Sequence, residues 1–250
     1  MATLNEKPVR LLMHDMISSL GLKLGQSFTR EQAVQWFAEH YPNVKPGTVA
    51  AHLIRLSTNV PTRLHFSARA DGSDDKFFKI DSSHFRLYEA GRDPTPISEL
   101  TPPSDDATTQ DAAPIASDEF AYEHDLRDYL ARNLHIIEPA LRLYSDEGIT
   151  GVEFPVGGRY IDILAVDAKG DYVVIELKVS RGYDRVVGQL LRYISWIKQH
   201  HADPGQKVRG IIVAKTITED LLLACSEVPT VNLFEYTLSI QVKQVALNRG

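Results

Sequence analysis

The sequence predicts an α/β (α+β) protein of two domains, and three observations lead to that fold class. Residues 1–93 contain three helical patterns followed by two strand-like runs, which is the element order of an N-terminal winged helix-turn-helix. Residues 94–117 have no Lys or Arg and no hydrophobic periodicity, as is typical of a flexible acidic linker. Residues 118–250 alternate between helical and strand patterns. A chain of 250 residues is long enough for both domains, and we expect each to fold alone.

The first domain begins with the three helical patterns. Apolar residues recur at helical spacing from Val9 to Leu20. Thr29-Arg30-Glu31-Gln32 has the form of a capping box and opens a second helix. A third helix is expected to start at Lys45-Pro46-Gly47-Thr48. The residues of the second and third helices that we expect to face inward are Val34, Phe37, Ala38, Val49, Leu53 and Leu56.

The other face of the third helix is polar and carries groups that can bond phosphates or base edges. In a winged helix-turn-helix this helix enters the major groove, and the following hairpin touches the DNA backbone. Strand-like runs at 63–68 and 76–80, around Asp71-Gly72, would form that hairpin. The alternative is a small protein-binding module whose charges are a solvated face. On the first interpretation, DNA contacts come from Thr48, His52, Arg55, Asn59, Arg63 and Lys76.

The overall composition excludes several classes of protein. An apolar share of 43% and a charged share of 24% are those of a globular chain rather than a disordered one. No apolar run reaches the ~18 residues of a membrane-spanning helix, and the first residues do not resemble a signal peptide. The single cysteine, Cys225, cannot form an internal disulfide, which suits a reducing compartment. We therefore expect a cytoplasmic protein with no membrane contact.

The net charge limits how the chain could bind nucleic acid. A value of −6 argues against binding by bulk electrostatics, for which a basic domain is usual. The charge is +2 over residues 1–93, −4 over the linker and −4 over residues 118–250. Contacts with DNA would therefore depend on local basic patches.

A more specific pattern lies in the second domain. Residues 159–167 form a predicted strand, 168–171 a turn and 172–179 the return strand. Folded about that turn, Asp162 lies opposite residue 177, within one position, while period 2 puts Glu176 and Lys178 on one face. The hairpin therefore gathers two carboxylates and a lysine among Ile, Leu and Val side chains.

Such a cluster suits metal-assisted hydrolysis of a phosphodiester. Two nearby carboxylates repel each other, and burial makes each charge costlier. Mg²⁺ relieves both effects, because it is commonly held by one or two carboxylates together with water and substrate phosphate. A lysine beside them can orient a water or stabilise charge on a phosphate oxygen. The alternative is an ion-paired strand in which Lys178 only neutralises Glu176.

Two further features lie outside the hairpin. Glu123 falls within the apolar stripe of a helix expected from about residue 118, and a carboxylate on a buried face needs a partner. That partner could be the metal, directly or through water, or a core arginine such as Arg159. The residues of that stripe are Phe120, Leu126, Tyr129, Leu130 and Leu134. Gln189 and Tyr193 share one flank of a helix expected at 183–198. They could bond a phosphate oxygen, although alone they would pass as ordinary boundary residues.

In this order, Glu123, Asp162, Glu176-x-Lys178 and Gln189-x-x-x-Tyr193 resemble the PD-(D/E)XK nuclease superfamily. The run from about Tyr122 to Ala214 is similar to the C-terminal nuclease domain of the endonuclease NucS (mismatch endonuclease) family, notably in DLRDYLARNLHIIEPALRLY and VIELKVSRGYDRVVGQLLRYISWI. The resemblance implies a restriction-endonuclease-like mixed sheet flanked by helices. It makes Asp162 and Glu176 metal ligands, Lys178 the catalytic lysine, and Glu123, Gln189 and Tyr193 supporting residues of the active site. Arg159 would contact a phosphate.

The expected function is therefore an Mg²⁺-dependent endonuclease acting on double-stranded DNA, with Mn²⁺ able to substitute. Glu123 would hold a second metal ion or its water shell, and the resemblance implies products with 5′-phosphate and 3′-hydroxyl ends. One active site cuts one strand, so a double-strand cutter of this size is expected to be a homodimer.

The N-terminal region departs from the family, whose own N-terminal domain is a β-rich DNA-binding and dimerising module. Mismatch or damage sensing therefore does not carry over, and restriction or defence fits at least as well as DNA repair. A rival interpretation is a DNA-binding regulator with a catalytically silent nuclease-like domain. A third is a protein-interaction adaptor without affinity for DNA.

Overall fold

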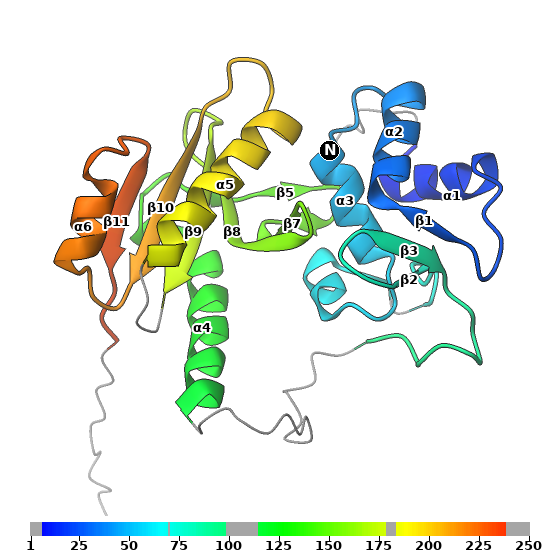
Figure 1. Ribbon diagram of the computed structural model, residues 1–250, viewed down its shortest axis with the longest axis horizontal. Helices are drawn as coiled ribbons and strands as arrows, with labels where there is room; N and C mark the ends of the chain where they lie inside the picture. Colours follow the sequence, from blue (N-terminus) through cyan, green and yellow to red (C-terminus); the bar gives the residue numbers. More distant parts are fainter. Residues whose placement is uncertain (1–6, 70, 99–114, 179–183, 239–250) are drawn as a thin grey trace, which may run out of the picture.

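The computed structural model describes residues 7–69, 71–98, 115–178 and 184–238, and their elements form two lobes (Figure 1). The first lobe contains three α-helices and a three-stranded antiparallel sheet in the order β1-β3-β2. Three helices followed by a hairpin are thus present, as predicted. The elements of this lobe are α1 (Val9–Ser19), β1 (Ser27–Thr29), α2 (Arg30–His40), α3 (Pro46–Arg55), the 3-10 helix η1 (Pro61–Phe66), β2 (Phe77–Lys79) and β3 (His84–Leu87).

The start of α2 follows from its first residues. The Thr29 side chain accepts a hydrogen bond from the Gln32 backbone N–H, and the Gln32 side chain accepts one from the Thr29 N–H. The predicted capping box is therefore confirmed. Phe37 is buried, as expected, whereas Ala38 is exposed, so its predicted inward orientation is wrong. The apolar face of α2 is formed instead by Ala33, Trp36 and Phe37.

The hairpin differs from its prediction. Residues 63–68 do not form a strand: Pro61 opens a 3-10 helix there, which turns Arg63 and Phe66 into the core. The hairpin consists of β2 and β3 instead, and it turns at residues 80–83 rather than at Asp71-Gly72. Asp81 fixes that turn, because its carboxylate accepts hydrogen bonds from the backbone N–H groups of Ser83 and His84.

The second lobe is built on a six-stranded mixed sheet. Its order is β11-β10-β9-β8-β4, with β7 also paired to β8. Strands β9, β10 and β11 are parallel to one another, whereas β8 is antiparallel to β9, β7 and β4. The elements of this lobe are α4 (Ile115–Arg132), the 3-10 helix η2 (Leu134–Ile136), β4 (Arg142–Leu143), β5 (Ser145–Asp146), β6 (Ile149–Thr150), β7 (Val152–Val156), β8 (Arg159–Val166), β9 (Tyr172–Lys178), α5 (Asp184–His200), β10 (Val208–Ala214), α6 (Glu219–Ser226) and β11 (Val231–Glu235).

Helices cover both faces of this sheet. Apolar residues of α5 and α6 pack on one face, against Leu164, Val174 and Ile212. Residues of α4 pack on the other face, against Ile163 and Ile175. The side chains of the predicted hairpin at 159–179 therefore alternate between two buried layers, as period 2 requires. Most of the predicted linker lies outside the described residues, and α4 begins at Ile115, three residues before the predicted boundary.

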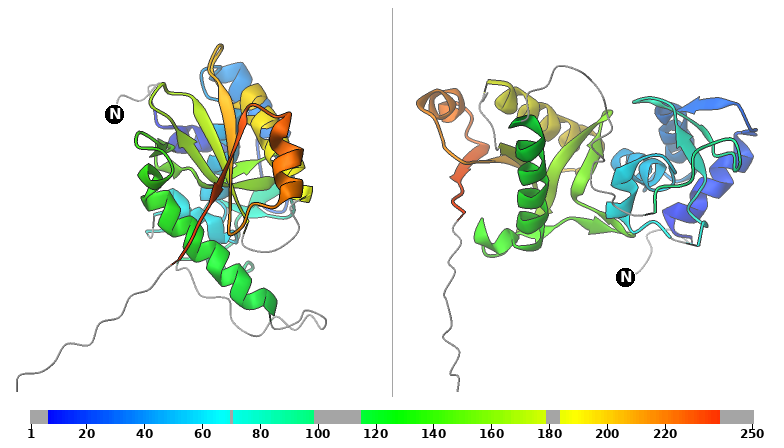
Figure 2. Two further views of the ribbon diagram at one scale, coloured as in Figure 1. Left: turned by 90° about the vertical axis from the view of Figure 1, so that its left-hand side faces the viewer. Right: turned by 90° about the horizontal axis from the view of Figure 1, so that it is seen from below.

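The larger of the two hydrophobic clusters in the described residues is shared by the two lobes, whereas the cluster under α4 belongs to the second lobe alone. A continuous cluster of buried residues includes Val49 and Ile54 of α3 together with Phe154 and Val156 of β7. Figure 2 shows the first lobe lying against the β7–β8 end of the sheet. At Gly47 the two lobes approach so closely that a Cβ atom would lie 2.5 Å from Nδ1 of His201. Hydrogen bonds across the boundary join Val9 and Arg55 to Glu147, Thr62 to Glu153, and Thr150 to His65.

No helix in the described part of the chain is both long enough and apolar enough to span a membrane.

Candidate active site

The register of β8 and β9 brings the two predicted ligands together. Ile163 pairs with Ile175, so the next residues outward, Asp162 and Glu176, face each other across the two strands. This register is within one position of the prediction. The Asp162 Oδ2 atom accepts a hydrogen bond of 2.8 Å from the backbone N–H of Leu177, and the carboxylate is thereby fixed between the strands.

Glu176 is a buried carboxylate, with 3% of its surface exposed. Its Oε2 atom accepts a hydrogen bond of 2.9 Å from Nε2 of Gln189, but Oε1 is buried and has no hydrogen-bond partner among the described residues. Burial raises the pKa of Glu176 well above its ordinary value, and the neighbouring Asp162 charge raises it further. A buried oxygen without a partner indicates that a further group belongs at this position.

Helix α5 supplies the amide that holds Glu176. Gln189 Nε2 also donates to the Tyr193 hydroxyl, at 3.2 Å, so the predicted pair forms one hydrogen-bonded unit with Glu176. Tyr193 is buried, and burial together with the Glu176 charge raises its pKa to about 12. Helix α5 comes close to the sheet because Gly210 on β10 has no side chain: a Cβ there would lie 2.8 Å from Leu190 Cδ2.

The pKa of Asp162 is raised as well. Burial raises its pKa to about 6, the Leu177 hydrogen bond opposes that rise, and the Glu123 charge adds to it. Glu123 is half-buried on α4 and forms no hydrogen bond or ion pair within the described residues, Arg159 included. Its charge acts on both Asp162 and Glu176. The stripe predicted around Glu123 was wrong at Tyr129, which is 53% exposed, while the Phe120 side chain lies outside the described residues.

Lys178 ends β9 and shares the sheet face of Glu176, as predicted. It is half-buried, and its positive charge lowers the pKa of Glu176 against the larger effects of burial and Asp162. The following residues, 179–183, lie outside the described part of the chain.

The donor set suits a hard divalent cation with few protein ligands. Asp162 and Glu176 offer oxygen atoms whose charges repel, and such a cation relieves that repulsion. Among the described residues, no three His, Cys, Asp or Glu side chains lie close enough to hold a metal ion together. Glu123 is therefore not brought together with Asp162 and Glu176 as a third ligand among the described residues. The remaining ligands would be water and substrate, as is common for Mg²⁺.

Glu153 is a neighbour of the site that sequence reasoning missed. It lies on β7 between the residues that pair with Ile161 and Ile163, and therefore beside Asp162. Its backbone is in the left-handed region, with φ of 47°, which is uncommon for a residue other than glycine. The signal that could have found it is the Gly157-Gly158 turn, which fixes the register of β7 against β8.

The Glu153 carboxylate is held from both lobes. Thr62 of η1 donates a hydrogen bond of 2.6 Å to Oε2, and Arg127 of α4 donates to Oε1. The charges of this pair act on Asp162 in opposite senses: Arg127 lowers the Asp162 pKa and Glu153 raises it. The first lobe thereby contacts a carboxylate that adjoins the candidate active site.

The face of α3 that was predicted to read DNA is buried in the structure. Thr48, His52 and Arg55 are at most 6% exposed, because β6, β7 and α5 of the second lobe cover the side of α3 that was expected to face DNA. Arg55 satisfies its guanidinium internally, on Asp74 and on the carbonyl oxygens of Ser67 and Glu147. These three side chains therefore do not face outward.

The remaining residues that were predicted to contact DNA differ in whether their side chains are accessible. Arg63 is 2% exposed and pairs with Asp75, so its predicted exposure is also wrong. Asn59 is half-buried and bonds the backbone N–H and carbonyl of Lys79 through its side chain. Lys76 is half-buried and Arg159 is exposed, so both can reach a ligand.

A mixed sheet with paired carboxylates on two central strands, a lysine two residues further on and a supporting helix is the arrangement that the resemblance to PD-(D/E)XK nucleases implies. Residues 122–228 match the family model of the endonuclease NucS C-terminal domain, and this part of the chain is accordingly a NucS-like nuclease domain. Residues 8–87 match a different model, described as a domain of unknown function (DUF7669).

Individual relatives are similar over about two fifths of the chain. Endonuclease NucS of Pyrococcus furiosus is 35% identical over 97 residues, which cover 39% of this chain and 33% of that protein. Endonuclease NucS of Methanopyrus kandleri is 31% identical over 100 residues, covering 40% of this chain and 35% of that protein. The chain thus spans about a third of the length of the curated relatives that it matches.

Two solved structures are similar over a longer part of the chain. A repair endonuclease from Pyrococcus abyssi has a TM-score of 0.38 at 21% identity, covering 62% of this chain and 51% of that one. A complex of EndoMS with double-stranded DNA has a TM-score of 0.37 at 21% identity, covering 63% and 53%.

Proposed function

We propose that this protein is a DNA endonuclease that hydrolyses phosphodiester bonds with Mg²⁺, for which Mn²⁺ can substitute. The observation that carries the proposal is the buried pair of Asp162 and Glu176, in which Glu176 Oε1 has no partner among the described residues. The match of residues 122–228 to the NucS C-terminal domain supports the same activity. The substrate that we propose is double-stranded DNA, in restriction, defence or repair.

The residues of the site divide the chemistry among them. Asp162 and Glu176 would hold the cation, which when bound would polarise the scissile phosphate. Gln189 keeps Glu176 in place by bonding Oε2, which leaves Oε1 free for a ligand. Lys178 orients the attacking water and stabilises negative charge on the phosphate. Tyr193 fixes the Gln189 amide through its hydroxyl.

Cleavage assays with single variants test this assignment. Plasmid DNA and duplexes containing a mismatch, a modified base or an abasic site would be incubated with protein and Mg²⁺. We expect Asp162→Asn and Lys178→Met to lower the cleavage rate by ~10²–10⁴-fold. The matched controls are Asp220→Asn on α6 and Lys169→Met on the β8–β9 turn, both exposed. EDTA should stop cleavage.

The outcomes separate the candidate functions. Cleavage within a few-fold of wild type in either site variant would remove the assignment. Tight DNA binding without cleavage in Mg²⁺ or Mn²⁺ would instead indicate a regulator with a silent nuclease-like domain.

We also propose a homodimer, since one active site per chain cuts one strand and two-fold dimers are the commonest oligomers. Light scattering is expected to give twice the chain mass of 28.0 kDa, free or on DNA. A monomer in both states would contradict the dimer and indicate a nicking enzyme.

A further inference from the structure

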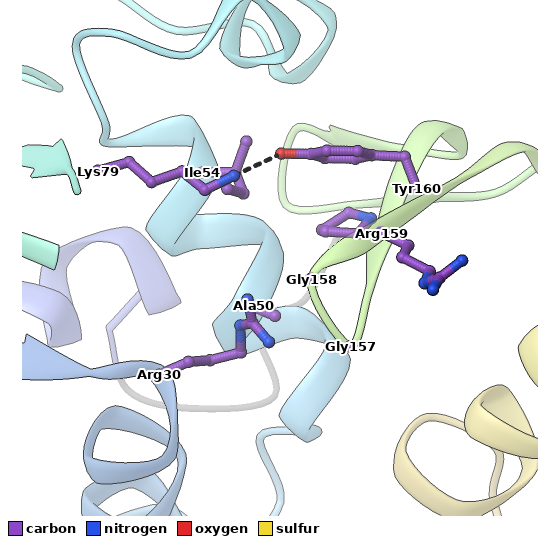
Figure 3. Close-up of a pocket in the computed structure, with 9 residues that line it drawn as sticks. Arg30, Ala50, Ile54, Lys79, Gly157, Gly158, Arg159 and Tyr160 are labelled. Carbon is purple, nitrogen blue, oxygen red and sulfur yellow. Dashed lines mark hydrogen bonds between the residues drawn. The ribbon is translucent and has the colours of Figure 1, made fainter. Parts of the chain in front are cut away.

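Basic side chains from both lobes meet at the boundary near the start of β8. Arg30 opens α2, Lys79 ends β2, and both extend toward the Gly157-Gly158 turn and Tyr160, as Figure 3 shows. The hollow between them has a volume of about 10 Å³, which is room for a single water-sized group. No free nucleotide fits there, so a ligand could insert only one atom from outside.

The cations at this boundary lack acidic partners. Within the described residues, Arg30, Lys79 and Arg159 form no ion pair with a carboxylate. Arg30 donates to the carbonyl of Ser82, and Lys79 Nζ lies 3.2 Å from the Tyr160 hydroxyl and 5.5 Å from the centre of its ring. Burial lowers the pKa of Lys79, and repulsion by Arg30 lowers it further. Two cations held together without a counter-charge favour an anion.

The nearest acid is already occupied. Asp81 attracts Lys79, but its carboxylate accepts hydrogen bonds of 2.8 Å from the N–H groups of Ser83 and His84 and contacts the His84 ring. It is about half exposed. Asp81 therefore fixes the hairpin turn rather than pairing with Lys79.

Arg159 connects this boundary with the candidate active site. Its side chain points away from the hollow in Figure 3, and its charge lowers the pKa of Tyr193, whose hydroxyl contacts Gln189. Asp162 follows three residues later on the same strand, a distance of about 10 Å at 3.3 Å per residue. The phosphates of one strand of B-DNA recur every ~3.4 Å along the helix axis, so a strand over Asp162 reaches the boundary within about three nucleotides.

We infer that Arg30, Lys79 and Arg159 bind the phosphodiester backbone of the DNA strand that enters the active site. This inference rests on the proposed function and adds a phosphate-binding site that is complete only when both lobes are present. The glycines at 157 and 158 have φ of 53° and 87° and leave the turn without side chains. A Cβ at Gly158 would lie 3.2 Å from the Ser82 Cβ, so a larger residue would crowd the boundary.

The test measures how salt weakens DNA binding. Fluorescence anisotropy with a labelled 20-base-pair duplex in Ca²⁺ would give Kd between 50 and 200 mM salt for Arg30→Gln, Lys79→Gln and the double variant. We expect each single variant to bind several-fold more weakly and to reduce the salt slope by about 1, the value for one lost phosphate contact. The control is Arg92→Gln, whose side chain is 71% exposed outside the boundary, and its slope should be unchanged.

Two further variants separate DNA binding from a purely structural role. Lys79→Arg keeps the charge and should keep the slope, and so should Tyr160→Phe, which removes only the hydroxyl partner of Lys79. If wild type cleaves DNA while Arg30→Gln and Lys79→Gln keep its slope, the inference fails and the proposed function stands. A slope reduced equally by Tyr160→Phe, with a lower melting temperature, would also overturn it. Absence of cleavage by wild type counts against the proposed function and leaves the slopes as the test of the inference.

Discussion

Asp162 holds its proton more tightly in the folded protein than an ordinary aspartate does, because burial raises its pKa from 3.8 to about 6. For a carboxyl group with a raised pKa, the stabilising contribution is complete at low pH and is lost as the pH rises through the folded value. The Asp162 contribution is therefore lost between about pH 4 and pH 6. A divalent cation would replace the proton above that range.

The first expectation is that the metal-free protein loses stability as the pH rises from 5 to 7.5. The Asp162 share over this pH range should be about 1–2 kcal/mol, because part of the rise in pKa from 3.8 to about 6 is already titrated below pH 5 and one pKa unit corresponds to about 1.4 kcal/mol. Mg²⁺ should raise the melting temperature at pH 7.5 more than at pH 5. Asp162→Asn should flatten the pH profile and remove the Mg²⁺ effect, whereas Asp220→Asn should behave as wild type. Matching profiles for wild type and Asp162→Asn would contradict this account.

A second expectation concerns the pair of Arg127 and Glu153. Arg127→Met would leave the Glu153 carboxylate without its cation beside Asp162, and we expect a loss of about 2–3 kcal/mol. Glu153→Gln removes a charge that repels Asp162 as well as the ion pair. It should therefore lower the free energy of unfolding clearly less than Arg127→Met does. Urea unfolding measures both, with exposed Arg132→Met on the same helix as the control, expected within about 0.5 kcal/mol of wild type. Equal losses for the two site variants would refute the argument.

Among the elements, α3 is a helix that other parts of the structure cover on all sides. Every residue from Gly47 to Arg55 is buried, so the helix has no solvent-exposed face beyond its first residue. The His201 ring that meets Gly47 is itself enclosed by Tyr144, Phe154 and Tyr172, with ring centres 5.0–5.1 Å away. It therefore has little room to move aside.

The third expectation follows from that contact. Gly47→Ala should destabilise the protein by about 1–3 kcal/mol, because its Cβ would overlap the His201 ring. Combining it with His201→Ala should cost less than the sum of the single variants. Gly188→Ala on α5 is the matched control: no atom lies within 4 Å of its Cβ, so a gain of about 0.5–1 kcal/mol is expected. Additive losses at Gly47 and His201 would show that the two residues are independent.

The sequence was informative wherever local pattern decided the structure. The hairpin of β8 and β9 could be predicted because apolar residues flank a turn closed by Gly170, and its register brings Asp162 to Glu176. The burial of Arg55 could not be predicted. Its partners lie at positions 67, 74 and 147, and a polar helix face looks the same whether water or a second lobe covers it. Glu153 was missed for a similar reason, since its neighbours come from three separate segments.

At the scale of the whole molecule, the shared core favours one unfolding unit over two. Residues of α3 and β7 pack in the same apolar cluster, and removing either lobe would expose that surface to water. This argues against the expectation that each domain folds alone.

The fourth expectation tests that conclusion. A protease site inserted within residues 102–113 would allow the chain to be cut between the lobes. We expect the two fragments to co-elute on size exclusion and the cut protein to unfold in one transition by calorimetry. The same insertion left uncut serves as the control. Fragments that separate and melt independently would show two autonomous domains.

The close contact of α3 with β7 and His201 also bears on protein engineering. A designer who wished to give the proposed nuclease domain a DNA-recognition module would naturally exchange residues 1–93 for that module and join it at the linker. Such a chimaera would leave Phe154 and Val156, both buried here, facing solvent. It would also remove Thr62 from Glu153, beside Asp162 of the candidate active site. For the second lobe to be transplanted, β7 would first need a new polar surface. The buried contact between the lobes, rather than the linker, therefore determines how the chain can be divided.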